Sequence, residues 1–468
     1  MLQKLKQNLA IDLRSLAVMR ILLSLVLIYD WVDRLGDAKA FYSNDGVLPL
    51  ATYFSHDWNY FHFSLFTLNG AWEFQALLIL VGIFAATCVL LGYKTKIFTL
   101  ISWLLLISVH NRNPLITQGG DDLMRLAFFW MLFLPWGKFY SIDSIDNQNQ
   151  NLETRHFSWA SIGWILQLFS VYFFSGLLKT SAEWHEDGTA LYYALSLDQM
   201  LMPFGKMIYH QKELLVFLSK STFYLEVFTP LLFLIPFKTK WFRTAGALLM
   251  ITFHAGTGLM LFVGLFFAIG ISCLTSLLPG EWFDKFFSKI FVYKTSSELN
   301  EFKKPMINYL AFVAIFYILF WNMGTIPQFK FKPSKKIEGL GRLLRIDQNW
   351  GMFAPGVFKD DGWYIMQAET FDGDTIDINR NGKKVDFSKP DYVLKHIKND
   401  RWRKFQEHYI LQQNQHIRLH YCLFLRNEWN EKNPDKILKS LSVIYMMEFT
   451  EPDYKTKPVT KEILAECR

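Results

Sequence analysis

The sequence predicts an α-helical polytopic membrane bundle of about nine transmembrane helices, followed by a small extracytoplasmic α+β domain. Three observations predict this fold class. Of the 468 residues, 51% are hydrophobic and only 19% are charged, which is too apolar for an ordinary soluble protein. The apolar residues form separate blocks of membrane-spanning length. Near the C-terminus the pattern changes to an alternation of apolar and polar residues.

Each apolar block is expected to be a helix, because lipid satisfies no backbone hydrogen bonds. The first block follows Lys4, Lys6 and Arg14, and no small-residue cleavage site follows it, so we expect a retained helix rather than a leader peptide. The seventh and eighth blocks are contiguous, and a single bent element is an alternative for that pair. The expected spans are Val18–Trp31, Ala71–Leu91, Ile97–His110, Leu123–Trp136, Phe157–Leu178, Ser221–Phe237, Thr244–Phe262, Val263–Leu278 and Met306–Trp321.

Lysine and arginine in the loops predict the orientation. Basic residues such as Lys94, Lys96 and Lys238 concentrate in the loops on the side of the N-terminus, which places that side in the cytoplasm. An odd number of spans then places the chain from about Asn322 onward outside the cytoplasm. We therefore expect a membrane domain over residues 1–323 and an extracytoplasmic domain over residues 324–468. The net charge is +7, but the basic residues cluster in short loops between the spans, so the lipid bilayer, and not nucleic acid, is the expected partner.

The C-terminal region has the pattern of an α+β domain. Trp363–Ile378 alternates apolar and polar residues around Asp372-Gly373, and Asn381-Gly382 supplies a second tight turn, so β-hairpins are expected. Arg401–Trp429 is amphipathic and predicts a helix, and Leu438–Phe449 predicts another strand.

The four cysteines form no metal-binding pattern, and no metal is predicted. Cys88 and Cys273 lie inside apolar blocks. Cys422 and Cys467 lie in the C-terminal region, where a disulfide would form if that region faces an oxidising compartment. Their spacing alone does not decide the pairing.

Lys179 is the first candidate for chemistry, because it stands at the end of the apolar run Phe157–Leu178. One interpretation is a lysine whose stem packs in lipid while its ammonium reaches water. The other is a lysine in an apolar setting that serves as a base near neutral pH. The spacing does not decide between them.

Further candidates lie in the outer loops and inside the spans. Asp121, Asp122 and Arg125 flank the start of a helix, where they form either a cap with a salt bridge or the mouth of a cavity that also holds Lys179. His254 and Glu226 lie inside apolar blocks, where they pair with each other or hydrogen-bond between helices.

One outer segment has the composition of an interfacial element. Trp184, Tyr192, Tyr193 and Met200–Met202 are expected to lie on the outer membrane surface.

Several familiar motifs are missing from the sequence. It contains no Walker loop, no Rossmann glycine pattern after a strand, no HExxH and no GxSxG, which disfavours nucleotide hydrolysis, zinc proteolysis and serine hydrolysis of the nucleophile-elbow type. A secondary transporter is a further alternative, although the spans show no obvious duplicated halves.

Five stretches resemble the horizontally transferred transmembrane domain (HTTM) family of vitamin K-dependent gamma-carboxylase-like membrane proteins. They are YSNDGVLP from Tyr42, NRNPLITQGGDD through LPWGKFYSID ending at Asp143, YFFSGLLKTSAEW from Tyr172, FHAGTGLMLFVGLFF from Phe253, and NWGMFAP from Asn349. They occur in the family's order over most of the chain. The resemblance implies several membrane helices followed by a lumenal domain.

The resemblance also implies roles for single residues. Lys179 matches the lysine that deprotonates reduced vitamin K in the carboxylase, Trp184 follows at the same distance, and His254 matches a histidine of the FH segment. Where the carboxylase has a functionally important histidine, this chain has Gly120, followed by Asp121 and Asp122. That difference bears on the carboxylation half of the reaction more than on the quinol half.

Two functions of different classes follow. The first is a quinol-dependent enzyme with epoxidase-type chemistry, with or without glutamate carboxylation, in which Lys179 and His254 are catalytic. Asp121, Asp122, Arg125, Trp184 and Glu226 would position the substrate. Its implied cofactor is reduced vitamin K or menaquinol, with O2, and with CO2 if carboxylation is retained. The second is a non-catalytic maturation or interaction factor for a secreted polypeptide.

Overall fold

The computed structural model describes residues 2–147, 151–301, 304–330 and 332–468, most of which are helical. Each of the nine apolar blocks overlaps a helix, although several boundaries differ. These helices are α2 (Leu13–Gly36), α5 (Trp72–Leu91), α6 (Thr95–Arg112), α7 (Gly119–Met131), α8 (Trp159–Leu178), α12 (Lys212–Phe228), α13 (Thr239–Met260), α14 (Phe266–Leu274) and α16 (Pro305–Thr325).

Five helices of the described residues are long and apolar enough to cross a membrane, and a bent pair raises the number to six. The five are α2, α5, α8, α12 with its 3-10 extension to Phe233, and α16. The bent pair joins residues 266–277 to α15 (Glu281–Phe287) at 107°. A helix as short as α7 or α14 does not cover a hydrocarbon core of about 30 Å. The chain is therefore a multi-pass membrane protein, and nine crossings remain a prediction.

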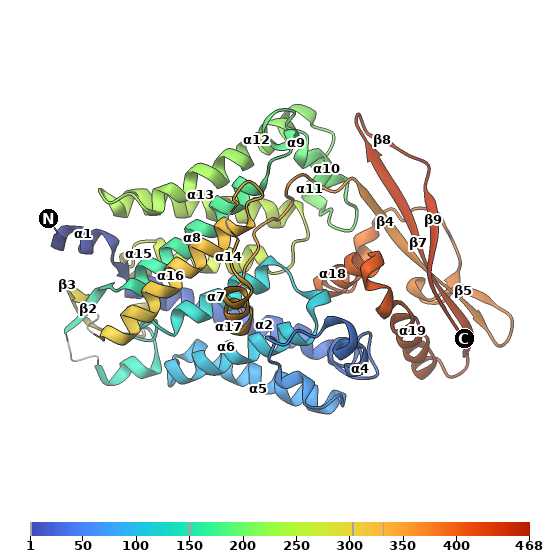
Figure 1. The fold of residues 1–468 in the computed structure, drawn as a ribbon, viewed down its shortest axis with the longest axis horizontal. Coiled ribbons are helices and arrows are strands. Elements are labelled where there is room, and N and C mark those ends of the chain that lie inside the picture. The colour runs from blue at the N-terminus through green and yellow to red at the C-terminus, as the bar shows by residue number, and fades with distance from the viewer. Residues whose placement is uncertain (1, 148–150, 302–303, 331) are drawn as a thin grey trace.

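Shorter elements connect these helices. They are α1 (Leu2–Leu9), α3 (Ala38–Tyr42), α4 (Leu50–Thr52), α9 (Ala182–His185), α10 (Ala190–Ser196), α11 (Pro203–Ile208) and α17 (Lys335–Leu344). A sheet not expected from the sequence lies beside α1: β1 (Ile11–Asp12) pairs antiparallel with β2 (Asn151–Phe157), which pairs parallel with β3 (Lys294–Glu301). Figure 1 shows this sheet and the N-terminus at one end of the helical bundle, and the C-terminal region at the other.

The C-terminal region contains the expected hairpins. β4 (Asp360–Thr370) pairs antiparallel with β5 (Thr375–Asp377) around the Asp372-Gly373 turn, and β5 pairs with β6 (Lys383–Lys384) after Asn381-Gly382. Both residues of that second turn have positive φ, as a tight hairpin turn requires. The expected second long strand is β7 (Leu438–Glu451).

Two further strands complete a six-stranded sheet. Five of its strands follow the order β6-β5-β4-β7-β8, in which β8 (Lys455–Thr456) pairs with the end of β7. The sixth strand, β9 (Thr460–Cys467), pairs with the middle of β7. The expected amphipathic helix is divided into α18 (Asp400–Tyr409) and α19 (Arg418–Lys432). Both helices lie between the sheet and the membrane bundle (Figure 1). A disulfide joins Cys422 of α19 to Cys467 of β9, with 6.0 Å between their Cα atoms.

The outer segment expected to lie on the membrane surface is buried instead. Trp184, Tyr192, Tyr193 and Met200 form a second core cluster, which also contains Leu261 at the end of α13. These large rings fill the space between α10, α12 and the C-terminal region, so the interfacial assignment of this segment is wrong.

Candidate active site

Lys179 stands at the C-terminal end of α8, which is apolar along most of its length. The Ser158 hydroxyl caps the start of the helix by accepting the backbone N–H of Ser161, and the helix ends where the Lys179 N–H donates to the Gly176 carbonyl. Tyr172, Ser175 and Lys179 share one face, because they are spaced three and four residues apart. α8 thus carries a polar stripe toward the end of the bundle that meets the C-terminal region.

The Lys179 ammonium is buried and forms an ion pair with Glu226 of α12. Its Nζ lies 2.6 Å from Glu226 Oε2, and the two side chains are only 3% and 5% exposed. Nζ also donates to Ser175 Oγ at 2.8 Å and, more weakly, to the Ser175 carbonyl at 3.4 Å. These three contacts use all three N–H groups. The interpretation of Lys179 as a lysine that reaches water is therefore wrong, because a countercharge inside the bundle holds it.

An aromatic wall and a segment from the C-terminal region cover this pair. Nζ lies 5.1 Å from the centre of the Trp184 ring, within the range of a cation–π interaction. The Trp184 indole N–H donates to the Phe353 carbonyl at 3.0 Å, and the Ser181 N–H donates to the Pro355 carbonyl at 3.0 Å. Residues 349–355, the NWGMFAP segment, therefore pack against the residues that follow Lys179, and we call this segment the roof.

The roof is anchored to the membrane helices before it reaches Lys179. Gln167 of α8 donates to the side chain of Gln348 at 2.8 Å, and the Trp350 indole donates to the same oxygen. Arg125 of α7 donates to the backbone carbonyl of Arg345 at 2.6 Å. Arg125 therefore holds the segment that leads into the roof.

His254 lies deeper in the bundle than Lys179. Its Nε2 is 2.9 Å from the Tyr172 hydroxyl. Tyr172 precedes Lys179 by seven residues, which is about 10 Å along the helix axis. Among the described residues, His254 Nδ1 has no hydrogen-bond partner. Because Glu226 binds Lys179 and His254 binds Tyr172, the suggested Glu226–His254 pair is wrong.

Asp121 belongs to a buried cluster of charges that joins the two parts of the chain. It caps α7 by accepting the Gln118 N–H at 2.9 Å. Its carboxylate also binds Arg34 of α2 at 2.9 Å and Arg401 of α18 at 2.6 Å. Arg401 in turn lies 2.7 Å from Asp30. Two arginines and two aspartates neutralise one another here, and we call these four residues the interdomain clamp.

The neighbours of Asp121 also have structural contacts. Asp122 lies 2.9 Å from Arg125, as the expected salt bridge at the helix start requires. Gly120 packs against α14: a Cβ atom there would lie 3.2 Å from the Cα of Phe266. The backbone of α14 thus occupies the space that a histidine at this position would need.

Sequence reasoning missed several residues that build the site and the clamp. Ser175 precedes Lys179 by one helical turn, and that spacing was a usable signal. Asp30 and Arg34, two opposite charges four residues apart inside an apolar block, were another. Nothing in the sequence linked Arg401 to Asp121, which lies 280 residues away.

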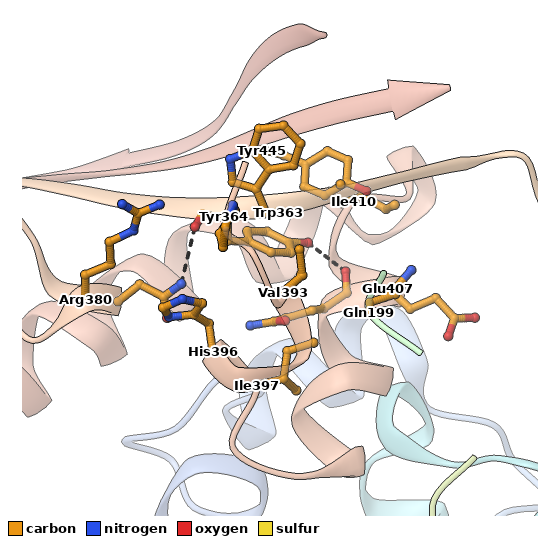
Figure 2. A pocket seen from close by; sticks show the side chains of 14 residues that line it. Gln199, Trp363, Tyr364, Arg380, Val393, His396, Ile397, Glu407, Ile410 and Tyr445 are labelled. Atoms are coloured by element: carbon orange, nitrogen blue, oxygen red, sulfur yellow. Dashed lines mark hydrogen bonds between the residues drawn. The ribbon is translucent and has the colours of Figure 1, made fainter. Parts of the chain in front are cut away.

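Two hollows lie in or beside the C-terminal region. The lining of the smaller hollow includes Trp363, Tyr364, Val393, His396 and Tyr445 (Figure 2), and its volume of about 20 Å³ has room for a single water. The larger, of about 600 Å³, has the size of a ligand pocket. We call it the interdomain groove; it runs between residues Gly36, Asp37, Lys39, Ala40 and Asp45 on one side and Trp402, Tyr421, Phe424, Leu425, Glu428, Glu431 and Lys432 on the other.

Within the described part of the chain, no group of three or more His, Cys, Asp or Glu side chains is placed to hold a metal ion. The candidate site is thus built from one ammonium, one carboxylate, a hydroxyl and aromatic rings.

Comparison with known proteins gives one match. The family model described as HTTM domain matches residues 8–282, which include Lys179, Glu226 and His254. The roof and Arg401 lie beyond the matched range. No curated protein and no solved structure matches the chain.

Proposed function

The chain belongs to the HTTM domain family, and we propose that it is a membrane enzyme in which Lys179 and Glu226 remove a proton from a quinol carried in the bilayer. The observation that carries the proposal is the buried Lys179–Glu226 pair, 2.6 Å apart. Ionisable pairs inside a membrane bundle are costly, and they usually serve a function.

The residues around Nζ fit the head of a quinol. The Trp184 ring offers a flat surface beside the ammonium. The contact from Nζ to the Ser175 carbonyl is long, at 3.4 Å, so a substrate hydroxyl can replace it at little cost. Glu226 Oε1 has only a 3.3 Å contact with the Ser175 hydroxyl and keeps capacity to accept a hydrogen bond.

The pair moves a proton without a net change of charge. Lys179 passes one proton from Nζ to Glu226 Oε2, and the free amine then takes the proton of the substrate hydroxyl. The proton lost by the substrate is thus stored as the Glu226 carboxylic acid, and the regenerated ammonium faces the new anion. A buried amine with a carboxylate as proton acceptor is suited to this transfer.

When bound, reduced vitamin K or menaquinol would supply the electrons for reaction with O2 to an epoxide. The chain's own residues hold the ring, store the proton and exclude water. Tyr172 lies farther along the same face of α8, and its hydroxyl contacts His254 of α13. Both side chains would contact a substrate that extends from Lys179 into the bundle. Glutamate carboxylation with CO2 is the stronger form of the proposal. The Gly120 position, filled by α14, gives that form no support.

The proposal is tested on the purified full-length protein in nanodiscs, supplied with reduced menaquinone or reduced vitamin K in air. Quinol loss and epoxide formation are measured by chromatography. We expect turnover by the parent and its loss in Lys179→Ala and Glu226→Gln. Lys179→Arg should also lose turnover, because a guanidinium keeps the ion pair but does not give up its proton.

The matched control is Lys206→Ala, which removes an exposed lysine of α11. It should turn over like the parent. Equal turnover in Lys179→Ala and the parent, or no binding and no turnover of either quinol by the parent, would refute the proposal.

A second function, holding a secreted polypeptide, is favoured by the interdomain groove. Its lining includes the rings of Trp402, Tyr421 and Phe424. Carboxylates and lysines line it as well, and Lys39 pairs with Glu431 at 2.8 Å. A photo-crosslinking residue in place of Leu425 should capture a secreted polypeptide in the native host, and the same residue in place of Lys383 should not. Equal capture at both positions, or at neither, would contradict this function.

A further inference from the structure

The helix α17 turns its apolar side chains away from the protein. Ile337, Leu340 and Leu343 recur at every third residue and are 41%, 50% and 48% exposed, whereas Gly339 and Gly341 are buried. A helix on the surface of a soluble domain has the opposite arrangement, because its apolar stripe faces the core. The stripe of α17 therefore faces a partner outside the chain.

Close packing fixes this orientation. A Cβ atom at Gly339 would lie 2.5 Å from the Phe61 ring, and one at Gly341 would collide with the Tyr317 hydroxyl. That hydroxyl donates to the Ile337 carbonyl at 2.7 Å. Only glycine allows such a close approach on both sides. α17 is thus held between α16 and the loop of residues 58–63 with its apolar stripe pointing outward.

The adjoining loop is aromatic and exposed. Trp58, Tyr60, Phe61 and Phe63 all present their rings at the surface, and Tyr60 is 81% exposed. Aromatic side chains with a polar edge concentrate where the hydrocarbon core meets the lipid headgroups. The loop and α17 together form one continuous surface, because Phe61 packs on α17.

Basic residues border the apolar stripe. Lys330, Lys335 and Lys336 are exposed. Lys332 donates to the carbonyls of Gly324 and Ile326, at the end of the membrane-crossing α16. At about 15 Å, α17 is too short to cross the bilayer. A short helix with an apolar stripe and lysines, attached to the end of a span, has the properties of an interfacial helix.

We propose that α17 and residues 58–63 form an amphipathic surface that lies in the membrane interface and binds anionic phospholipids. The apolar stripe enters the acyl-chain boundary, and the lysines contact the headgroup phosphates. This surface stands apart from the proton chemistry and does not depend on it. It bears on the site only through the chain that follows, since residues 345–348 lead from α17 into the roof.

The chain offers a direct test of depth. Cys88 and Cys273 are buried and Cys422 is paired with Cys467, so a cysteine introduced at Leu340 is the accessible thiol. The variant Leu340→Cys, labelled with an environment-sensitive dye, is reconstituted as the full-length protein in phosphatidylcholine vesicles. Spin-labelled lipid should quench this dye several-fold more than iodide does. The control Lys383→Cys, on the exposed β6, should show the reverse.

A second measurement tests the charge. Spin-labelled phosphatidylglycerol should quench the Leu340 dye more strongly than spin-labelled phosphatidylcholine. Lys335→Glu with Lys336→Glu should bring the two signals together, because each lysine near a surface contributes a factor of about five to the binding of anionic lipid. If the Leu340 dye behaves like the Lys383 dye, α17 faces water or another protein and the proposal is wrong. If the two lipids quench equally in the parent, the preference for anionic lipid is wrong.

Discussion

Asp361 joins the C-terminal sheet to the membrane domain through a buried carboxyl group. One of its oxygens accepts the backbone N–H of Asp198, in the loop after α10, and the other has no hydrogen-bond partner among the described residues. Lys389 bridges the Asp198 carboxylate and Glu448 of β7, at 2.6 Å from each. Burial, together with the neighbouring Asp198 carboxylate, raises the pKa of Asp361 from 3.8 to about 7.

This raised pKa makes the stability of the protein depend on pH. In the folded protein Asp361 keeps its proton up to about pH 7, whereas in the unfolded chain it loses the proton near pH 4. Above pH 4 the folded state therefore binds the extra proton, and the free energy of unfolding falls as the pH rises. The difference between the two pKa values corresponds to roughly 4 kcal/mol of unfolding free energy. This stabilisation is completely lost above about pH 7.

The substitution Asp361→Asn removes the titrating group and keeps an oxygen that can accept the Asp198 N–H. We expect it to raise the unfolding temperature at both pH values, and clearly more at pH 8 than at pH 5, where the folded carboxyl is still protonated and only the unfolded chain has lost the proton. Thermal unfolding of the purified protein, followed by tryptophan fluorescence at both pH values, measures the effect. Asp360→Asn, which alters an exposed neighbour, is the matched control and should show no pH-dependent gain.

The reasoning fails if the gain from Asp361→Asn is the same at pH 5 and pH 8. That result would mean that the carboxyl is already ionised at pH 5, and that Lys389 or water compensates its charge.

Three further outcomes follow from the contacts. Arg401→Ala leaves a single arginine of the clamp, Arg34, to neutralise the buried carboxylates of Asp30 and Asp121, and it should cost about 3–5 kcal/mol of stability, seen as a large drop in unfolding temperature. Arg403→Ala on the same helix, whose partners Asp400 and Glu407 are its own neighbours, should cost far less. Cys422→Ser removes the disulfide that closes the loop to Cys467 and should cost about 4 kcal/mol of stability. The same assay measures this against the parent with and without reductant, and an unchanged unfolding temperature would contradict the prediction. Gly120→Ala should cost about 1–3 kcal/mol, because α14 must move to admit a methyl group, and a neutral result would show that α14 yields freely.

The sequence was sufficient to locate the helices, because each apolar block overlaps one. It was less informative about their lengths. The block Leu123–Trp136 looked long enough for a crossing, but α7 ends at Met131, shortly before Pro135. Proline disfavours a helical conformation in the residue before it and offers no N–H to a helix. The small sheet of β1, β2 and β3 was missed because its strands are short and far apart in the chain.

The candidate site was predictable only in part, because its partners lie far apart along the chain. Lys179 stood out because an apolar run ends at it, and Glu226 because it interrupts another. Their pairing depends on how α8 packs against α12, which no local pattern encodes. The same holds for Trp184. The composition of its segment indicated a membrane surface, but its ring is buried beside Lys179. Local patterns found the groups, and the tertiary packing set their partners.

The choice of cation separates the clamp from the site. In the interdomain clamp both cations are arginines, whose planar guanidinium groups bind carboxylates through several donors and stay charged at every accessible pH. At the end of α8 the cation is Lys179, and its partner Glu226 is equally buried. If this pair served only to hold α8 to α12, an arginine would do so with more hydrogen bonds and no loss of charge. An ammonium is the weaker structural cation and the one that can give up a proton, so its use at Lys179 favours proton transfer over a purely structural role.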